Sequence, residues 1–527
     1  MIKAVRGTRD LLPPETALWN FVEAAVRDVF RAYNFQEIRT PIFEATELFA
    51  RGVGEETDIV SKEMFTWEDG VKAADYAVYK KWLTEKFPAV QSFSSINPST
   101  ATPVSPVPTW YQNGQEDYFV FSYRLTPEVM NELKRAKTFK DSNIFDFKNL
   151  HLVTAEPVPN SVRFDVEGLA VTCENLPVDT RPQWQTLRPE NTAGVVRAYI
   201  EHGLAKRGLN KLYYIGPQFR RERPQKGRYR QFYQIGAEVI GPASAGSESP
   251  ARDAEVLEML ATLLDRLGIT DWNLELNSVG TPTDRVQFNE ALRKALEPVK
   301  DKMCGDCQRR AVTNPLRVFD CKVPEDQPII ASLPRITQFL GEDSRTHFEA
   351  VQAILKSVGV EFHINDRLVR GLDYYTRTAF EFTHGALGAQ NAILGGGRYD
   401  GLSEALGGPA APGIGFAIGE DRLVMSLKET AEGVLRKPDV YVAPMAGLNG
   451  EAARLAHELR RHDVVVELGD DTFRLKKSFE AATKAGAKYI LIVGENEEKS
   501  DVFTLKNLAT GEQVSVPRAE LARRILG

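Results

Sequence analysis

Residues 214–241 contain the densest group of side chains that could bind phosphate. The segment is typical of a strand, a charged loop and a second strand, and its loop carries six cations: Arg220, Arg221, Arg223, Lys226, Arg228 and Arg230. Guanidinium groups match phosphate oxygens with paired donors. So many cations repel one another unless water or a polyanion neutralises them. Taken alone, the loop fits a solvated charged hairpin and a polyphosphate site about equally.

The second strand of this segment has two different faces, because side chains alternate along a strand. One face is apolar and typical of a core, with Tyr233, Ile235, Ala237 and Val239. The opposite face carries Gln234, Gly236 and Glu238. We expect this face to present an amide and a carboxylate to a ligand, across a glycine that leaves room for it.

A second group of reactive side chains lies in residues 367–381. Arginine, aspartate and two tyrosines gather there, at Arg370, Asp373, Tyr374 and Tyr375. An edge strand with a bulge at Gly371 is the plain interpretation. That interpretation does not readily explain why these residue types cluster there.

Two weaker patterns complete the set. Residues 187–194 are typical of a helix start, for which a simple capped turn is a sufficient explanation. Residues 395–402 and 413–423 combine glycine-rich strands with a following helix, and glycine alone is weak support for any function. Together these segments add four candidate side chains: Glu190, Thr192, Tyr399 and Arg422.

The elements that must position these residues can be read from periodicity. Residues 16–30 have apolar side chains at helical spacing, and residues 35–44 read as a strand containing Pro41. Residues 187–240 predict a helix, then two strands around the loop. Residues 250–360 predict mainly helices with one strand near 272–277, and residues 361–425 predict strands ending in a helix. From about 438, short apolar strands alternate with helices, which indicates a small α/β domain built on βαβ units.

Residues 71–183 differ from their surroundings. They include a stretch rich in serine, threonine and proline at 94–108, which has linker composition. Strands are predicted at 118–123 and 150–154, and a helix is predicted to begin at Thr126. We interpret the segment as a small inserted module whose role the sequence does not reveal.

Composition limits the class of protein. A chain of 527 residues with 43% hydrophobic and 26% charged residues is expected to be globular and to form several domains. No apolar run approaches the roughly 20 residues that span a bilayer, and the first residues do not resemble a secretory signal. We therefore expect a cytoplasmic protein with no membrane partner. The net charge of −6 argues against one global basic surface for nucleic acid, but not against a local one.

The four cysteines are too few for a disulfide scaffold in a chain of this length. Cys304 and Cys307 form a C-x-x-C pair, and Cys321 follows. A tetrahedral zinc site needs a fourth ligand, and none lies at a familiar spacing. The expectation is therefore reduced, partly buried thiols and no protein-bound metal.

These segments together resemble the class II aminoacyl-tRNA synthetases, in the form specific for histidine. Residues 214–241 resemble motif 2 of the class, 413–423 resemble motif 3, 38–44 resemble motif 1, and 370–375 resemble a signature of histidyl-tRNA synthetases. The resemblance covers residues 1–70 and about 184–527. It implies an α+β fold: an antiparallel sheet flanked by helices, with inserted modules and a C-terminal α/β anticodon-binding domain.

The resemblance also implies roles for individual residues. In the family pattern Arg220 and Arg370 hold the ATP α-phosphate from opposite sides and are the catalytic pair. ATP is also bound by Arg228, at the distal phosphates, and by Arg422, on the adenine and γ-phosphate. Histidine is bound by Glu190, Thr192, Gln234, Glu238, Tyr374, Tyr375 and Tyr399. The chain departs from the usual pattern at Asn191, where glycine is common, and at Asp421, where glutamate is common.

The implied organisation follows from the same resemblance. The catalytic core comprises 1–70 with 184–240 (motifs 1 and 2) and 361–432 (signature and motif 3), with a helical insertion at 241–360. The anticodon-binding domain comprises 437–527, and 71–183 is an additional module. The implied activity is ligation of L-histidine to tRNA(His) using ATP with its substrate-bound Mg²⁺, in a homodimer.

One alternative is a protein that has the same fold but does not catalyse the reaction. A regulatory subunit of ATP phosphoribosyltransferase shares the catalytic domain and charges no tRNA. Such relatives generally lack the anticodon-binding domain and parts of motif 2 and of the signature, whereas this chain retains all of them. A module that only binds tRNA is a third alternative, and it would not need Arg220, Arg370 and Arg422 together.

Overall fold

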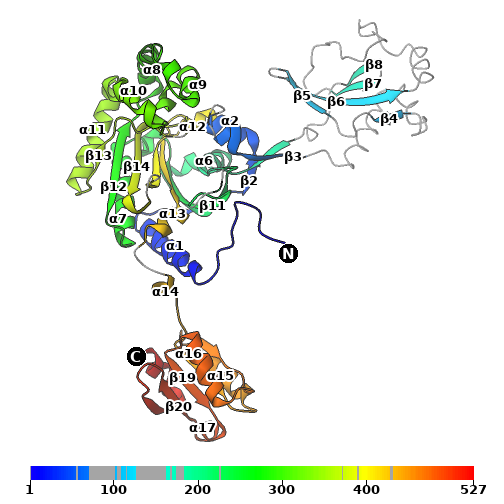
Figure 1. Cartoon of the computed structure of the whole chain (residues 1–527), viewed down its shortest axis with the longest axis vertical. Coiled ribbons are helices and arrows are strands. Elements are labelled where there is room, and N and C mark those ends of the chain that lie inside the picture. Colours follow the sequence, from blue (N-terminus) through cyan, green and yellow to red (C-terminus); the bar gives the residue numbers. More distant parts are fainter. Residues whose placement is uncertain are drawn as a thin grey trace. The chain divides into compact units, whose positions relative to one another are not determined.

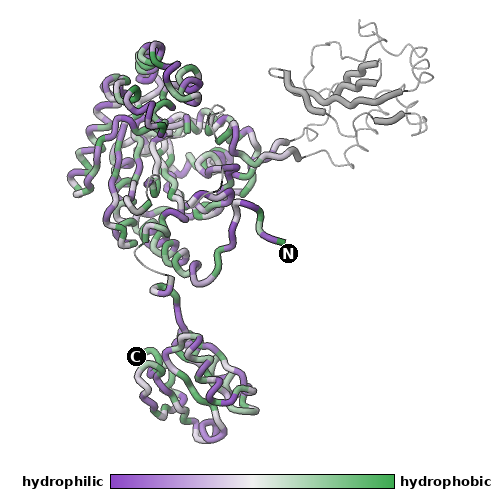
Figure 2. The backbone as a smooth tube through the Cα atoms, in the orientation of Figure 1, coloured by the Kyte–Doolittle hydropathy of each residue, from purple (hydrophilic) through white to green (hydrophobic). Residues whose placement is uncertain are grey.

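The computed structural model describes residues 2–54, 57, 59–69, 183–222, 224, 227–370, 372–387, 391–427 and 431–527, with five short strands between 101 and 173 (Figure 1). The chain forms two compact units. One comprises residues 1–10 and 25–426, and the other comprises residues 11–24 and 427–527. No helix of the described residues is long and apolar enough to cross a membrane. Hydrophilic and hydrophobic stretches are interspersed along both units (Figure 2).

An eight-stranded sheet forms the centre of the larger unit. Its strands, in spatial order, are β1 (Gln36–Glu37), β10 (Asn210–Phe219), β11 (Gln231–Ile240), β16 (Gly413–Gly419), β15 (Ala392–Arg398), β14 (Thr376–His384), β12 (Trp272–Ser278) and β13 (His363–Ile364). The five inner pairings are antiparallel, and only the outermost pairs, β1 with β10 and β12 with β13, are parallel. The predicted antiparallel sheet is therefore confirmed.

Helices with clear sequence signals flank this sheet. Helix α7 (Pro250–Arg266) begins with proline at its first position, and the Ser249 side chain accepts a hydrogen bond from the Ala251 N–H. Its apolar side is buried, and it packs against α11 (Glu342–Ser357) and touches β16. Strand β12 pairs with β14, so residues 272–278 belong to the large sheet although the sequence around them is mostly helical.

The predicted strand at 35–44 was wrong in one respect. The segment forms two separate strands, β1 in the large sheet and β2 (Phe43–Ala45) in a three-stranded sheet with β9 (Gln183–Leu187) and β3 (Phe65–Asp69). Pro41 lies between them and cannot donate to a ladder. The buried Arg188 side chain holds this break, because its Nη1 donates to the carbonyl oxygens of Thr40 at 3.0 Å and Pro41 at 3.2 Å.

Five strands are described in the inserted segment: β4 (Ala101–Pro103), β5 (Thr109–Asn113), β6 (Glu116–Leu125), β7 (Val162–Val166) and β8 (Leu169–Cys173). They form a sheet in the order β4-β6-β7-β8, and β5 also pairs with β6. The strand predicted at 118–123 is confirmed within β6. The strand predicted at 150–154 and the helix predicted from Thr126 lie outside the described residues.

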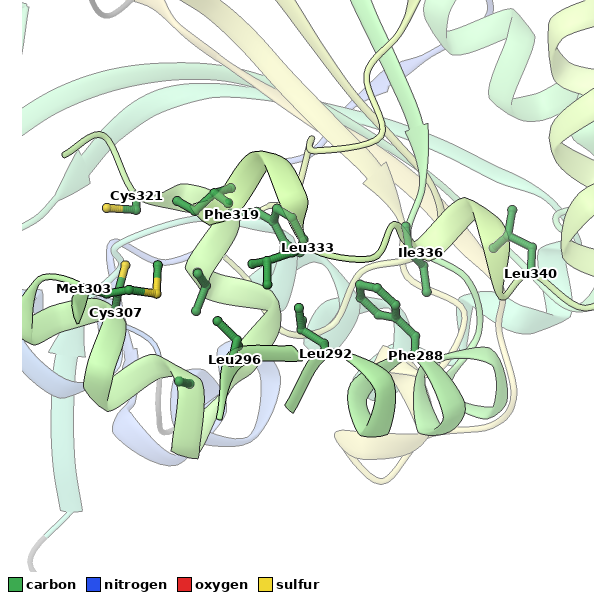
Figure 3. Packing of buried hydrophobic residues seen from close by; sticks show 13 residues of the cluster. Phe288, Leu292, Leu296, Met303, Cys307, Phe319, Cys321, Leu333, Ile336 and Leu340 are labelled. Carbon is green, nitrogen blue, oxygen red and sulfur yellow. The ribbon is translucent and has the colours of Figure 1, made fainter. Parts of the chain in front are cut away.

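Between β12 and β13 the chain forms a helical layer with its own apolar core. Its helices include α8 (Pro282–Leu296), α9 (Gly305–Thr313) and α10 (Gln327–Ser332). Helix α8 starts with a reciprocal cap between Thr281 and Asp284. The core between these helices has the thiols of Cys307 and Cys321 at one end, Leu292 in the middle and Leu340 at the other end (Figure 3).

The smaller unit contains the predicted alternation of strands and helices. Strand β17 (Val440–Pro444) runs parallel to β18 (Val466–Leu468) and β19 (Tyr489–Val493), and the connections include α15 (Asn449–Arg460) and α16 (Leu475–Ala485). Strands β20 (Val502–Asn507) and β21 (Gln513–Pro517) extend the sheet in the antiparallel sense. The predicted βαβ units are confirmed.

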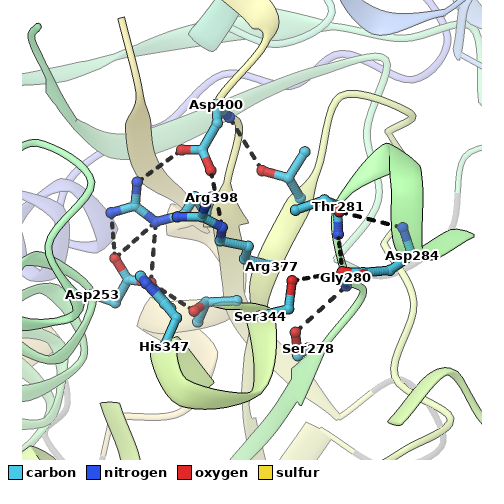
Figure 4. Close-up of polar contacts among 12 residues, drawn as sticks. Asp253, Ser278, Gly280, Thr281, Asp284, Ser344, His347, Arg377, Arg398 and Asp400 are labelled. Carbon is cyan, nitrogen blue, oxygen red and sulfur yellow. Dashed lines mark hydrogen bonds and ion pairs between the residues drawn. The ribbon is translucent and has the colours of Figure 1, made fainter. Parts of the chain in front are cut away.

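A buried ion pair joins a helix to the middle of the large sheet (Figure 4). Arg398 of β15 and Asp253 of α7 are both fully buried, and Arg398 Nη2 lies 2.6 Å from Asp253 Oδ1. Thr378 and His347 bind the other carboxylate oxygen at 2.6 and 2.8 Å. Burial alone would raise the pKa of Asp253, but Arg398 and His347 together outweigh it and the pKa falls to about 2.

We expect Asp253→Ala to destabilise the larger unit by roughly 3–5 kcal/mol, because Arg398 would keep its charge in the interior with one partner fewer. The carboxylate stabilises the fold above pH 4, and this contribution is lost as pH falls through about 2. Thermal unfolding measures the effect. Asp271→Ala, which removes an exposed carboxylate, is the matched control. Equal melting temperatures for the two variants would contradict this expectation.

Candidate active site

The polar residues singled out from the sequence meet at one cavity of about 350 Å³ in the larger unit. It is formed by the ends of β10 and β11, the loop between them, the loop before β14, and parts of β15 and β16. Nine of the eleven predicted site residues line it: Glu190, Thr192, Arg220, Arg228, Gln234, Arg370, Tyr374, Tyr375 and Arg422. The other two, Glu238 and Tyr399, lie behind its wall.

Three arginines and one carboxylate occupy the side of the cavity next to the charged loop. Arg228 Nη1 donates to Glu222 at 3.0 Å, and Arg220 Nη1 lies 3.9 Å from the same carboxylate. Arg422 Nη1 donates to the carbonyl oxygen of Ala392 at 2.9 Å. Burial lowers the pKa of Arg422, and repulsion from Arg228 and Arg220 lowers it further. This side of the cavity therefore has the electrostatics of an anion site.

Backbone and aromatic contacts fix the position of Arg220. Its Nε donates to the carbonyl oxygen of Pro189 at 2.9 Å, and its guanidinium lies 5.1 Å from the centre of the Phe232 ring. Neither contact involves the two outer guanidinium nitrogens, and the side chain lines the cavity. Arg220 is thereby ordered without a close ion pair, which leaves its charge available to a ligand.

Arg370 reaches the cavity from the loop before β14. Three strands of the sheet separate β14 from β10. Its Nη1 donates to Glu381 at 2.6 Å. Burial alone would lower the pKa of Arg370, but the Glu381 carboxylate outweighs it and raises the pKa. The buried Nε has no hydrogen-bond partner among the described residues. The guanidinium lies directly over Gly395 of β15, where a methyl group would overlap it.

Glu238 is fully buried and holds two hydroxyl groups. Its Oε1 accepts a hydrogen bond from Thr192 at 2.7 Å, and its Oε2 accepts one from Tyr399 at 2.7 Å. A side chain at Gly415, which faces Glu238 on the neighbouring strand, would overlap this carboxylate. Burial raises the pKa of Glu238 to about 8, although both hydroxyls oppose the shift. The folded protein therefore keeps this carboxyl largely protonated near neutral pH.

Glu190 caps the helix that follows it. Its carboxylate accepts hydrogen bonds from the N–H groups of Thr192 at 2.8 Å and Ala193 at 3.1 Å, in the first turn of α6 (Thr192–Glu201). The capped turn predicted from sequence is confirmed, and Glu190 and Thr192 line the cavity as well. Asn191 has a φ of −123°, so this position does not require glycine.

Tyrosine rings form the wall between Arg370 and Glu238. The rings of Tyr374 and Tyr375 are 4.7 Å apart, and the rings of Tyr374 and Tyr399 meet edge to face at 5.9 Å. Burial raises the pKa of each phenol, so all three remain hydroxyl donors at neutral pH. The preceding Asp373 does not line this cavity; its carboxylate accepts hydrogen bonds from Asn314 and Arg317 of the helical layer.

Several lining residues were not predicted. Glu222 and Glu381 moderate the charge of the arginines, and Asp421 lies 2.8 Å from Arg9. Glu222 could have been found as the single acid among the loop cations. Glu381 could have been found by alternation in β14, where it lies between the apolar residues Phe380 and Phe382. The pairing of Asp421 with Arg9 joins residues 412 apart, and no local pattern indicates it.

The expectation that no fourth ligand lies near the three cysteines was wrong. Asp326, five residues after Cys321, is buried, and its carboxylate lies within 4.8 Å of the three sulfur atoms. The short turn around Pro324 folds the chain back and brings this aspartate to Cys304. This cluster does not line the cavity.

Comparison with known proteins shows which families the two units of the chain match. The family described as "Histidyl-tRNA synthetase" matches residues 178–423, and the family described as "Anticodon binding domain" matches residues 439–527. The chain is 58% identical over 524 residues to the histidine–tRNA ligase of Koribacter versatilis (strain Ellin345), covering 99% of this chain and 95% of that one. It is 46% identical over 528 residues to that of Solibacter usitatus (strain Ellin6076), covering 100% and 99%.

The fold agrees with that of a solved relative. The crystal structure of apo S. aureus histidyl-tRNA synthetase superimposes with a TM-score of 0.65 and 30% identity, covering 100% of each chain. The similarity thus extends over both units and includes the strands that carry the cavity.

The raised pKa of Glu238 gives a pH dependence that can be measured. The unfolded chain releases this proton near pH 4.5 and the folded chain near pH 8, so the carboxyl lowers the stability of the fold progressively as pH rises between these values. We expect the melting temperature of the wild type to fall more between pH 6 and pH 8 than that of Glu238→Gln, which cannot ionise. Parallel pH profiles for the two proteins would show that Glu238 has an ordinary pKa.

Proposed function

The chain belongs to the histidyl-tRNA synthetase family and is a histidine–tRNA ligase, and we propose that the cavity described above is where it activates histidine with ATP. The observation that carries the assignment to this cavity is its charge. Four guanidinium groups line it together with four carboxyl groups: Glu222 and Glu381 pair with arginines of the cavity, whereas Asp421 pairs with Arg9 and Glu190 caps helix α6. A ligand with several negative charges would complete the site, and ATP supplies them.

In the proposed first step, a carboxylate oxygen of histidine attacks the α-phosphorus of ATP. A bond forms between that oxygen and phosphorus, the bond from phosphorus to the bridging oxygen breaks, and pyrophosphate leaves. Arg220 and Arg370 would neutralise the charge that develops on the α-phosphate oxygens. A carboxylate is already a nucleophile, so no side chain is required as a base. Positioning of the two substrates would supply much of the rate.

The distal phosphates would lie at Arg228, and Arg422 would contact the adenine ring and the γ-phosphate. The support for this placement is that both side chains line the same part of the cavity as Arg220 and share its repulsive electrostatics. Magnesium would arrive with ATP as part of the substrate. In the second step, a ribose hydroxyl at the 3′ end of tRNA(His) would attack the adenylate, and AMP would leave.

Histidine would bind on the tyrosine side of the cavity. Its α-ammonium group would lie near the carboxylate of Glu190, and its ring would lie near Gln234, Tyr374 and Tyr375. Both imidazole nitrogens need partners. We propose that Glu238, with Thr192 and Tyr399, completes this pocket from behind the wall, since its carboxyl can shift between the neutral and charged forms as the ring binds. Buried polar groups left unpaired would then exclude apolar amino acids.

The remaining expectations rest on the family. We propose that the unit containing residues 439–527 binds the anticodon, that the protein is a homodimer, and that it is cytoplasmic. The regulatory alternative has less support, because the chain retains the second domain and all four cavity arginines. The role of residues 71–183 is not part of this proposal.

We expect Arg370→Gln to slow formation of histidyl-adenylate by about 10²–10³-fold, the usual cost of removing one preorganised donor to a transition-state oxygen. Rapid quench with excess enzyme measures this step directly. Arg367→Gln is the matched control, because Arg367 lies three residues away and does not line the cavity. A normal rate in folded Arg370→Gln protein would defeat the assignment of Arg370.

The proposed homodimer is testable at motif 1. Ile42 and Phe43 are 46% and 52% exposed and adjacent in the chain where β2 begins, and such exposed apolar side chains suit an interface. We expect Phe43→Asp to convert a dimer to a monomer in light scattering. Val286→Asp, at an equally exposed apolar residue on α8, should leave the dimer intact. A monomeric wild type would contradict the proposal.

A further inference from the structure

Three thiols and one carboxylate meet inside the helical layer. Cys304, Cys307, Cys321 and Asp326 each offer one ligand atom, and these atoms all lie within 4.8 Å of one another. Cys307, Cys321 and Asp326 are buried, and Cys304 is partly exposed. In Figure 3, Cys307 and Cys321 lie at one end of the apolar cluster, close to Met303.

The spacing of the ligand atoms matches a tetrahedral site. Cys304 Sγ and Cys321 Sγ are 3.9 Å apart, and Cys321 Sγ is 3.2 Å from Asp326 Oδ2. Zinc–sulfur bonds of about 2.3 Å place the sulfurs of a tetrahedron about 3.8 Å apart, and the shorter zinc–oxygen bond brings the oxygen closer. Small side-chain adjustments would therefore suffice to bring all four atoms onto one ion.

The charges of the cluster favour a bound cation. Asp326 is 1% exposed, and among the described residues it forms no ion pair; its partners are the Cys304 N–H and the thiol of Cys321. A buried carboxylate without a cationic partner is costly. A divalent ion would offset both the carboxylate and the thiolates.

The surrounding backbone holds the four groups in place. Cys304 precedes helix α9 and Cys307 lies in its first turn, so their side chains project to the same side. The Val323 N–H donates to Cys321 Sγ at 3.4 Å, and the Gln327 amide donates to the carbonyl oxygens of Cys321 and Val323 at 2.9 and 3.3 Å. Such contacts around the ligands are typical of metal sites, where they fix ligand direction.

We propose that Cys304, Cys307, Cys321 and Asp326 bind one zinc ion. Three soft thiolates and one carboxylate in a tetrahedron favour zinc over magnesium or calcium, which require more oxygen ligands. All four positions are taken by protein groups, so the site is structural rather than catalytic. This proposal goes beyond the proposed function and departs from the expectation of no protein-bound metal.

The ion would brace a segment that reaches the active-site loop. Residues 314–320 connect α9 to Cys321, and within them Asn314 Nδ2 and Arg317 Nη2 donate to Asp373 Oδ1 at 3.2 and 3.3 Å. Asp373 immediately precedes Tyr374 and Tyr375. Zinc would thereby hold both ends of the 314–320 connection, which helps to position Tyr374 and Tyr375 through Asp373. The ion itself would not contact the cavity.

The test is the metal content of the full chain, purified without chelators and without a metal-affinity tag. We expect mass spectrometry of the elements to give about one zinc per chain. After removal of zinc, addition of Co²⁺ should produce thiolate-to-metal charge-transfer absorption and the visible bands of a tetrahedral site. Neither readout uses histidine, ATP or tRNA, so failure of this proposal and failure of the proposed function are distinguishable.

Matched variants assign the ligands. We expect Cys307→Ser and Asp326→Asn to lose the zinc and the cobalt spectrum. Cys173→Ser, which removes the cysteine that is not in the cluster, and Asp306→Asn, an exposed carboxylate on α9, should retain both. Circular dichroism distinguishes loss of the ion from loss of the fold, and the cobalt spectrum of the wild type does not depend on the variants.

Two results would overturn the proposal. One is wild-type protein that contains no zinc and gives no charge-transfer band with Co²⁺. The other is a disulfide between Cys304 and Cys321, detected in unreduced peptides, since their sulfurs are close enough to join with modest movement.

Discussion

Repulsion between arginines is the constraint on which the architecture of the active site depends. Arg220, Arg228 and Arg422 lie close enough that the first two lower the pKa of the third, and Arg370 faces them across the cavity. The protein offsets this repulsion in part, with Glu222, Glu381 and two backbone carbonyl oxygens. Full neutralisation by protein carboxylates would leave nothing for phosphate to bind. The partial compensation therefore explains how the arginines stay folded together without a ligand, and why the site would attract ATP.

The strands hold these charges because of what lies beneath them. Arg398 ends β15 with its guanidinium directed into the interior, at Asp253, and the next residue, Tyr399, binds Glu238. One residue thus ties the sheet to helix α7, and its neighbour would complete the proposed amino-acid pocket. Glycines at 395 and 415 give Arg370 and Glu238 the space that any side chain would take. Sheet packing and site geometry are set by the same few positions.

Local patterns in the sequence predicted much of this arrangement. Alternation along residues 231–240 put Gln234 and Glu238 on one face, and helical periodicity over residues 16–30 predicted α1 (Glu15–Ala32). Contacts between distant segments could not be predicted in the same way. The break at Pro41 depends on Arg188, nearly 150 residues away, and the pairing of Arg9 with Asp421 spans 412 residues. Asp326 was not predicted as a possible ligand because its spacing from the cysteines is not a familiar one. The turn that precedes it brings its carboxylate to the three sulfur atoms. The depth at which Glu238 lies, behind two hydroxyls, also required the structure.

The central claim is that this cavity activates histidine. The most direct test is exchange of labelled pyrophosphate into ATP by the purified protein. The exchange is measured without tRNA and with each amino acid in turn. We predict exchange that depends on histidine and is absent with other amino acids. Absence of exchange with histidine, in protein shown to be folded and dimeric, would contradict the claim and favour a regulatory relative that keeps the fold without the reaction.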